Sequence, residues 1–375
     1  MSRQGFSLGD VRVLPLARRR TLTSVDAVMA GAQGSMPPLS VDAAEARRLE
    51  GQVGAAAAAV RAAKGLGAAV LWIYGAHFLR NGGASVMGRL LRGGWVTHVA
   101  TNGAGSIHDW EYAWFGGSTE GVEENVAAGT FGTWDETSRH IHGAVMLGAL
   151  EGLGYGDSLA RFIAEDGGDV PELQVLEAAV VRDPGDPLNG ARCEVIGALR
   201  SGFLNSGRWS VTHRWKEASI FAQAWAAGVP VTVHPGIGYD IITNHPMFSG
   251  AALGRGGGMD FESFCGTVSG LEGGVVFSVG SAVMGPQVFE KSVSCVNNVR
   301  LQRGASVLGG HRIVVVDVQD GGGWDWTGGE PPKSNPAYYL RFCKSYSRMG
   351  GVMDYLQTDN VAFARHLLAA LEDEA

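Results

Sequence analysis

The sequence lacks several features that mark common protein classes. Its four cysteines, Cys193, Cys265, Cys295 and Cys343, lie far apart and form no CxxC pair, which disfavours a disulfide framework or a zinc site. No apolar run approaches the length of a membrane span, and the first residues contain no apolar signal-peptide core. We therefore expect a cytoplasmic protein that keeps its thiols reduced and has no membrane partner.

Positive charge and the common nucleotide motifs are also missing. The formal net charge is −7 and the only cationic run is Arg18–Arg20, so we expect no nucleic-acid partner. The ordinary dinucleotide fingerprint GxGxxG and the Walker loop are absent. Glycine, in contrast, is abundant, with 57 residues among 375, and it gathers after apolar runs. This distribution suits loops at the edge of a sheet.

The sequence predicts two parts. Residues 1–40 are expected to form an arm that lies on the body of the protein or on a neighbouring subunit. Residues 41–375 alternate apolar strands with helical segments and contain no obvious linker, so they are expected to form a single domain. The alternation is typical of a doubly wound α/β fold with a mostly parallel sheet.

Apolar runs predict the strands of this sheet. They are Ala68–Tyr74, Val96–Thr101, Val229–Val233, Gly273–Val279 and Arg312–Val316. A helical segment, Ser85–Arg92, joins the first two strands, so these should be parallel with a right-handed crossover. Further helices are expected at Ala43–Ala63, with Ser40 as the N-cap, and at Asn360–Leu371.

The stretch after the second strand has the strongest functional pattern. Asn102-Gly-Ala-Gly-Ser106 follows the strand, and the polar residues His108, Asp109 and Glu111 come next. A strand, a glycine turn and a polar cluster are typical of a ligand site at the carboxyl end of a sheet strand. A tight turn followed by a helix, capped by Ser106 or Asp109, is the alternative.

The order of elements resembles deoxyhypusine synthase. The segments that carry the resemblance are Gly75–Gly82, Thr101–Asp109, Pro230–His245, Gly273–Val276 and, more weakly, Phe342–Lys344. They fall in three blocks that cover about half of the chain. The resemblance implies a Rossmann-like fold, NAD as cofactor, transfer of an amine-containing group through an imine, and a homo-oligomer that is a tetramer in the related family.

The sequence also departs from that family. His108 stands where the family has a glutamate, Val279 lies near the position of a family histidine, and Phe342 replaces a tryptophan. A polyamine needs a carboxylate for each ammonium that leaves water, so these changes favour a shorter or less cationic amine. An NAD-dependent oxidoreductase, another enzyme on a different small substrate, and a non-catalytic NAD-binding protein remain the alternatives.

Candidate NAD-binding residues follow or flank the predicted strands. Asp109 would hold the ribose or orient His108, or would simply cap a helix. Ser281 would face a phosphate, or would form a plain turn between strand and helix. The full set is Gly75, Thr101, Asn102, Gly103, Gly105, Asp109, Gly273, Gly274 and Ser281.

Three residues are candidates for catalysis. Lys344 would trap the carbon skeleton as a Schiff base, and its alternative is a surface lysine on a helix. His108 would act as an acid or base near neutral pH, or would only bond a backbone carbonyl at a helix start. Asp240 would contact a cationic substrate, or would cap the backbone at Ile241–Thr243.

Substrate binding is assigned to Asp240, His245 and Asp317. His234 and His245 flank Asp240, and these three residues form the one His/Asp cluster that is compatible with a metal. Their spacing matches no metal signature, so we expect no metal.

Overall fold

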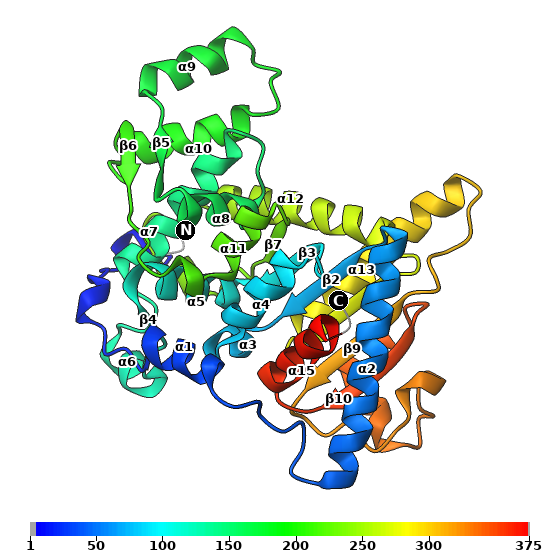
Figure 1. Ribbon diagram of the computed structural model, residues 1–375. Helices are drawn as coiled ribbons and strands as arrows, with labels where there is room; N and C mark the ends of the chain where they lie inside the picture. The colour runs from blue at the N-terminus through cyan, green and yellow to red at the C-terminus, as the bar shows by residue number, and fades with distance from the viewer. Residues whose placement is uncertain (1–4, 374–375) are drawn as a thin grey trace.

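Six parallel strands form the central sheet of the computed structural model, which describes residues 5–373 (Figure 1). The order across the sheet is β10-β9-β8-β2-β3-β7, and every neighbouring pair is parallel. The predicted doubly wound α/β fold is therefore confirmed. The strands are β2 (Val70–Tyr74), β3 (His98–Asn102), β7 (Val231–His234), β8 (Val275–Val279), β9 (Arg312–Asp317) and β10 (Val352–Gln357).

The strands are buried on both faces, because their side chains alternate between two hydrophobic cores. Trp72 and Phe277 pack on one face with helices α2 (Ala43–Leu66), α4 (Gly83–Arg92) and α15 (Asn360–Glu372). Leu71 and Val276 pack on the other face with α12 (Gly250–Ser269) and α13 (Met284–Gln302). In Figure 1 the first and last helices of the domain, α2 and α15, lie side by side.

The strand order places a switch point between β2 and β8. Counted along the chain from β2, the strands run 3-2-1-4-5-6 across the sheet from β7 to β10. The chain builds outward from β2 to β7, then returns to the middle and builds outward again through β10. In sheets of this order, ligands bind in the crevice outside the carboxyl ends of the two central strands.

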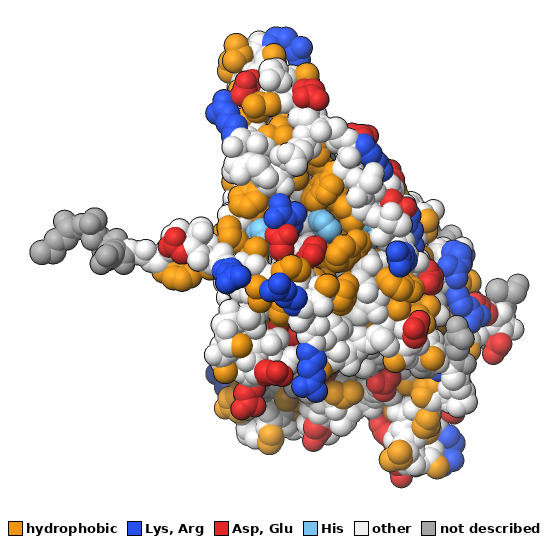
Figure 2. Space-filling view, turned by 90° about the vertical axis from the view of Figure 1, so that its left-hand side faces the viewer, with side chains coloured by type: hydrophobic (Ala, Val, Ile, Leu, Met, Phe, Trp, Pro, Cys, Tyr) orange, Lys and Arg blue, Asp and Glu red, His pale blue; other side chains and the backbone are white. Residues whose placement is uncertain are grey.

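A lobe projects from the β7 end of the sheet (Figure 1). Its helices are α7 (Asp135–Ala149), α8 (Tyr155–Ala164), α9 (Leu173–Arg182), α10 (Asn189–Arg200) and α11 (Ile220–Ala227). Strands β5 (Gly167–Val170) and β6 (Gly207–Ser210) form an antiparallel pair between them. Figure 2 shows histidine, basic and acidic side chains gathered on the surface at the base of this lobe.

The N-terminal arm lies on the body of its own chain. It contains short helices η1 (Leu8–Asp10) and η2 (Leu16–Arg18), strand β1 (Thr23–Ser24) and helix α1 (Val25–Gln33). Strand β1 pairs with β4 (Gly117–Ser118), and Leu14 bridges to Trp134. Residues 1–4 of the predicted arm lie outside the described residues. The arm therefore joins the surface next to helix α5 (Gly103–Phe115).

Helix α5 corrects the prediction of a glycine turn. Strand β3 passes directly into α5, and the side chain of Asn102 accepts a hydrogen bond from the Gly105 amide, at 2.9 Å, as the N-cap. Neither Ser106 nor Asp109 is the cap. At α2 the cap is likewise Asp42 and not Ser40. The remaining helices are α3 (Ala76–Arg80), α6 (Val122–Ala128), α14 (Arg341–Tyr346), η3 (Lys216–Ala218), η4 (Ile241–Asn244), η5 (Trp326–Gly328) and η6 (Pro336–Tyr339).

In the described part of the chain, the helices are all too short or too polar to cross a membrane. Within residues 5–373, no group of three or more His, Cys, Asp or Glu side chains is arranged to hold a metal ion. All four cysteines are free thiols.

Candidate functional site

A cavity of about 280 Å³ lies at the carboxyl ends of β3 and β7, where α5 begins and where the loop after β7 turns toward η4. It is lined by the arm, by α3 and by one face of α5. The lining residues are Arg19, Arg80, Ala104, Ile107, His108, Glu111, Thr119, Glu120, Val122, Phe131, Tyr239, Asp240 and Ile241. Two predicted catalytic residues, His108 and Asp240, thus lie in the same cavity.

A chain of hydrogen bonds connects the arm to His108. Arg19 donates to both carboxylate oxygens of Glu111, at 2.6 and 2.9 Å, in a pair whose side chains are each 1% exposed. Ser118 donates to Glu111 at 2.5 Å, and the Ser118 oxygen lies 2.5 Å from His108 Nδ1. Thr137 donates a fourth bond to Glu111, at 2.9 Å. The carboxylate is thus surrounded by donors and neutralised by one cation.

This chain fixes the tautomer of His108. The hydroxyl proton of Ser118 is committed to Glu111, so Ser118 can only accept from His108, and the proton of the ring must sit on Nδ1. Burial lowers the pKa of His108 to about 4, and the positive charges of Arg80 and Arg19 act in the same direction. The ring is therefore neutral at pH 7. Its Nε2 carries a lone pair, and no described residue bonds to it.

Asp240 lies at the N-terminus of α5. A carbon atom added at Gly103 would lie 1.9 Å from Asp240 Oδ2, so only glycine allows the carboxylate to approach the helix here. Asp240 is 4% exposed and accepts a bond from the Gly236 amide at 2.6 Å. Burial raises its pKa to about 6. Its carbonyl, and not its carboxylate, caps Thr243.

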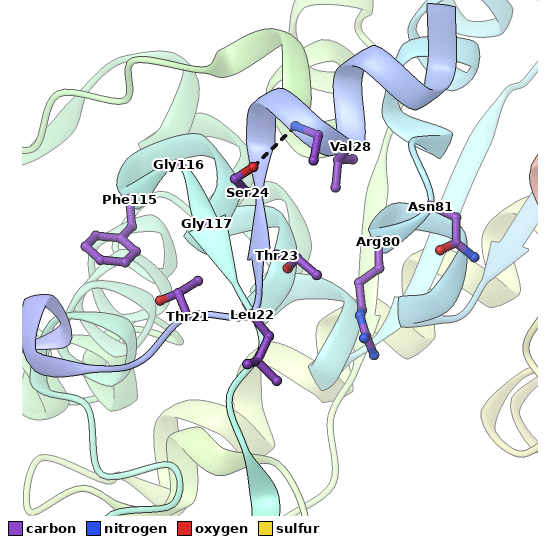
Figure 3. A pocket seen from close by; sticks show the side chains of 11 residues that line it. Thr21, Leu22, Thr23, Ser24, Val28, Arg80, Asn81, Phe115, Gly116 and Gly117 are labelled. Atoms are coloured by element: carbon purple, nitrogen blue, oxygen red, sulfur yellow. Dashed lines mark hydrogen bonds between the residues drawn. The ribbon is translucent and has the colours of Figure 1, made fainter. Parts of the chain in front are cut away.

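A second, larger cavity of about 650 Å³ lies on the other side of Arg80 (Figure 3). The arm and the end of α5 form most of its lining. Its residues are Thr21, Leu22, Thr23, Ser24, Ala27, Val28, Arg80, Asn81, Phe115, Gly116 and Gly117. Arg80 is the residue that the linings of the two cavities share.

The switch point between β2 and β8 contains close backbone contacts and unpaired polar atoms. A carbon atom added at Gly75 would lie 2.0 Å from the Gly280 carbonyl oxygen, so glycine at position 75 lets the two strand ends meet. The hydroxyl of Tyr74 and Oδ1 of Asn360 are buried and have no hydrogen-bond partner among the described residues. Asn360 lies next to Gly280 and its Oδ1 can accept a hydrogen bond from a ligand at this edge, whereas the Tyr74 side chain is fully buried and packs against Phe78.

Three predicted cofactor residues have internal partners. Thr101 is buried and donates to the Tyr74 carbonyl at 2.9 Å. A carbon atom added at Gly105 would lie 2.0 Å from Thr101 Oγ1, so Gly105 allows α5 to pack on β3. Asn102 caps α5, as described above. The groups that come close to these glycines are therefore other parts of the same chain and not a cofactor.

Asp109 is not available to a cofactor. It is fully buried and accepts from the amide of Ile220, at 2.7 Å, and from the hydroxyl of Ser219. It therefore caps α11 from another part of the chain. Burial raises the pKa of Asp109 to about 7, although these bonds act against the shift.

Gly273 and Gly274 lie apart from the other predicted cofactor residues. They precede β8, and so they lie at the amino edge of the sheet, one strand length from Gly75 and Gly103. A site along the carboxyl edge excludes them. Ser281 follows β8 at the carboxyl edge, but its hydroxyl oxygen accepts from the Gly285 amide at 3.1 Å, as in the turn alternative.

Lys344 lies outside this region and lines neither cavity. It belongs to α14, in the connection between β9 and β10. Its Nζ is 3.2 Å from the ring centroid of Tyr338 and 3.8 Å from Glu330. Both contacts stabilise the ammonium, whereas a Schiff-base lysine must be neutral. The catalytic role of Lys344 stays a prediction, and its position outside both cavities favours the alternative of a lysine with no role in the reaction.

His245 and Asp317 are also separated from Asp240. His245 is buried in a network in which Nδ1 accepts from Met247 and Nε2 donates to Asp135 at 3.0 Å. Asp317 ends β9 and accepts from the Gln319 amide. Because β9 and β7 are four strands apart at about 4.8 Å each, Asp317 and Asp240 cannot share one ammonium. Of the three residues predicted to bind substrate, Asp240 is the one that lines the cavity with His108.

Sequence reasoning missed Arg19, Arg80, Ser118 and Glu120 as parts of the site. Glu120 accepts from Trp134, at 2.9 Å, and from Gly132, and so it fixes the cavity wall. The available signals were weak. Arg19 was part of a short basic run, and Arg80 was one polar residue in a strand exit.

Comparison with known proteins gives little support for any family. No family model matches the chain, and no curated protein matches it. Similar solved structures include unliganded AgrE, at 14% identity, 88% of this chain, 33% of that chain and a TM-score of 0.42. Apo ArgZ, an arginine dihydrolase from the ornithine-ammonia cycle in cyanobacteria, is 14% identical over 87% of this chain and 33% of that chain, with a TM-score of 0.39. A putative LOR/SDH protein from Methanococcus maripaludis S2 is 14% identical over 97% of this chain and 74% of that chain, with a TM-score of 0.40.

The chain spans about a third of the length of AgrE and ArgZ. At these TM-scores, the likeness carries no argument about function. The resemblance to deoxyhypusine synthase is wrong, because no family model matches and these similar structures carry other names. The tetramer that the resemblance implied loses its support with it.

Proposed function

We propose that the protein is an NAD-dependent oxidoreductase that acts on a small hydroxy or amino compound in the cavity between Arg80 and Asp240. The observation that carries the proposal is the free Nε2 of His108, a neutral base of fixed tautomer, at the carboxyl edge of a 3-2-1-4-5-6 sheet. A cavity of about 280 Å³ suits a substrate of a few heavy atoms.

The polar groups at the edge of the sheet suit NAD. The cofactor would lie outside β2 and β8, where Asn360 Oδ1 has no hydrogen-bond partner among the described residues and Gly75 and Gly280 have no side chains. When it is bound, NAD supplies the acceptor for a hydride from a substrate carbon. The side chains of this chain then have to bind the substrate and take its proton.

His108 takes the proton in this proposal. The substrate C–H bond yields the hydride, the O–H or N–H bond on the same carbon yields a proton to His108 Nε2, and a C=O or C=N bond forms. Glu111 accepts from Ser118 and so stabilises the protonated ring, and Arg19 holds the Glu111 carboxylate in place with two hydrogen bonds. Asp240 accepts a hydrogen bond from the substrate or pairs with its ammonium. Because burial raises the pKa of Asp240 to about 6, it is mostly ionised at pH 7.5.

The test uses the full chain with NAD and a panel of 2-hydroxy acids, amino acids and primary amines, with NADH absorbance as the readout. His108→Asn keeps a donor for Ser118 and removes Nε2. We expect it to bind NAD normally in calorimetry and to lower turnover about 10²- to 10⁴-fold. His366→Asn is the matched control, because His366 bonds the Pro37 carbonyl and does not line the cavity.

Two results would contradict the proposal. If the protein does not bind NAD, the assignment of NAD as cofactor is wrong. If His108→Asn forms NADH at the wild-type rate, the assignment of His108 as the base is wrong. NAD binding without NADH from any substrate class would favour the non-catalytic alternative.

A further inference from the structure

The larger cavity beside the arm has no role in the proposed reaction, and its lining has an unusual composition. Of its eleven residues, Arg80 is the one with a charged side chain. In Figure 3, Arg80 and Asn81 lie on one side, Phe115 lies on the other, and the arm residues Thr21–Ser24 run between them. The volume of about 650 Å³ is in the range of small-molecule sites.

Arg80 has no counter-charge. No carboxylate in the described part of the chain lies within ion-pair distance of it, and its Nε is buried without a hydrogen-bond partner. The carboxylates of the neighbouring cavity are engaged elsewhere. Glu111 binds Arg19, Glu120 binds Trp134, and Asp240 binds the Gly236 amide. A guanidinium that is partly removed from water without a partner is unfavourable, and an anionic ligand would remove that penalty.

The other polar groups of the lining can donate hydrogen bonds. Thr21 Oγ1 is buried without a partner. Ser24 accepts from the Ala27 amide through its oxygen, so its O–H remains free. The side-chain amide of Asn81 makes no hydrogen bond with a described residue, whereas its backbone N–H donates to the His77 carbonyl. The hydroxyl of Thr23, in contrast, is used by Tyr112 and the Ser118 carbonyl. The free groups therefore favour a ligand rich in acceptor oxygens.

We propose that this cavity binds an oxyanion-bearing organic molecule, a phosphate ester or a polycarboxylate, with Arg80 as its charged contact. The oxyanion pairs with the guanidinium beside Asn81. The rest of the molecule lies along Thr21–Ser24, and an apolar portion packs on Leu22, Val28 and Phe115. The ligand is distinct from NAD and from the substrate of the smaller cavity.

The test is calorimetric titration of the full chain with inorganic pyrophosphate in low-chloride buffer, in the absence of NAD. We expect saturable binding that weakens at least tenfold in Arg80→Gln. Arg89→Gln removes an exposed arginine that pairs with Glu372, so it is the charge-matched control and should stay within twofold of wild type. Citrate in place of pyrophosphate distinguishes a polycarboxylate from a phosphate ligand.

Two further variants decide which cavity holds the anion. Asn81 lines the larger cavity alone, so Asn81→Asp places a repelling charge there and should weaken binding at least tenfold. Asp240 lines the smaller cavity alone, so Asp240→Asn should have no more than a twofold effect. An unchanged affinity for pyrophosphate in Arg80→Gln or in Asn81→Asp would overturn the proposal. A marked gain in pyrophosphate affinity in Asp240→Asn alone would also overturn it, because it would place the anion in the smaller cavity. Because NAD is absent, a failure of the proposed oxidoreductase would not affect these results.

Discussion

The two halves of the sheet end in different ways. Strands β3 and β7 lead to a cavity in which Nε2 of His108 has no partner among the described residues, while its Nδ1, Ser118 and the carboxylate of Glu111 are joined by hydrogen bonds. Strands β8 and β9 also end in polar residues, but Ser281 and Asp317 are bonded to amides within four residues of themselves.

The difference between the halves comes from the N-terminal arm. Arg19 reaches Glu111 across 92 positions of the chain and converts a local strand exit into a connected network. The arm also contacts the β8–β10 half, where Thr358 donates to the Leu39 carbonyl and Arg365 donates to the Ser35 carbonyl. These bonds do not involve the side chains of Ser281 or Asp317. A strand exit with glycine and polar residues is therefore insufficient for a site unless a distant element fixes its side chains.

The largest expected effect is on the network that the arm completes. Arg19→Ala leaves the buried Glu111 without its cation, and we expect a loss of about 3–5 kcal/mol in the free energy of unfolding in urea. Arg20→Ala is the matched control, because the Arg20–Glu124 pair is 78% and 67% exposed and should contribute little. Equal stabilities of the two variants would show that the arm does not support the site.

The second prediction concerns the buried carboxylate of the same half. The pKa of Asp240 is raised to about 6, so the folded state keeps its proton to a higher pH than the unfolded state does. Wild-type stability therefore falls as pH rises from about 4 to about 6, by up to about 3 kcal/mol from this group. Asp240→Asn has no such dependence and can still accept from Gly236.

The measurement is the free energy of unfolding of both proteins at several pH values. The stability of Asp240→Asn relative to wild type should rise through the window from about pH 4 to 6 and stay constant above it. A flat difference across that window would mean that Asp240 is not desolvated.

The third prediction tests the reason for glycine at position 105. In Gly105→Ala the added carbon meets Thr101 Oγ1, and we expect a loss of about 1–3 kcal/mol in the free energy of unfolding. Thr101→Ala removes the obstructing oxygen, so the double variant should lose less than the sum of the two single variants. Simple additivity would show that the glycine is needed for something other than this contact.

The sequence predicted most of the sheet and little of the network. Five strands were found because they are short apolar runs, and β10 was missed because Asp354 interrupts it. That residue forms an ion pair with Arg312 of the neighbouring strand, at 2.6 Å. Helix α12 was missed because glycines at 254 and 256–258 disfavour a helix, although Gly256 is needed where α12 packs on Tyr155.

The candidate site was predicted in part for a related reason. His108 and Asp240 were found because each lies in the segment that follows a strand, β3 ending at Asn102 and β7 at His234, and parallel strands bring such segments to one edge. Arg19, Ser118 and Arg80 come from segments whose contacts are set by tertiary packing, and no local pattern indicates that packing. The role of Asp109 could not be decided from the sequence, because a carboxylate next to a glycine turn and a carboxylate that caps a distant helix have the same local sequence.

The smallest expected effect sharpens the comparison from the other half. Lys344 would be essential if the protein worked through a Schiff base, but its ammonium lies over the Tyr338 ring and near Glu330, in the connection between β9 and β10. Lys344→Met keeps the length of the side chain and removes the charge. We expect NAD affinity and NADH formation to stay within twofold of wild type, and borohydride reduction in the presence of an amine substrate to leave no covalent adduct on the chain. An adduct that is present in the wild type and lost in Lys344→Met would return the chemistry to the β8–β10 half of the sheet and make the cavity at His108 secondary.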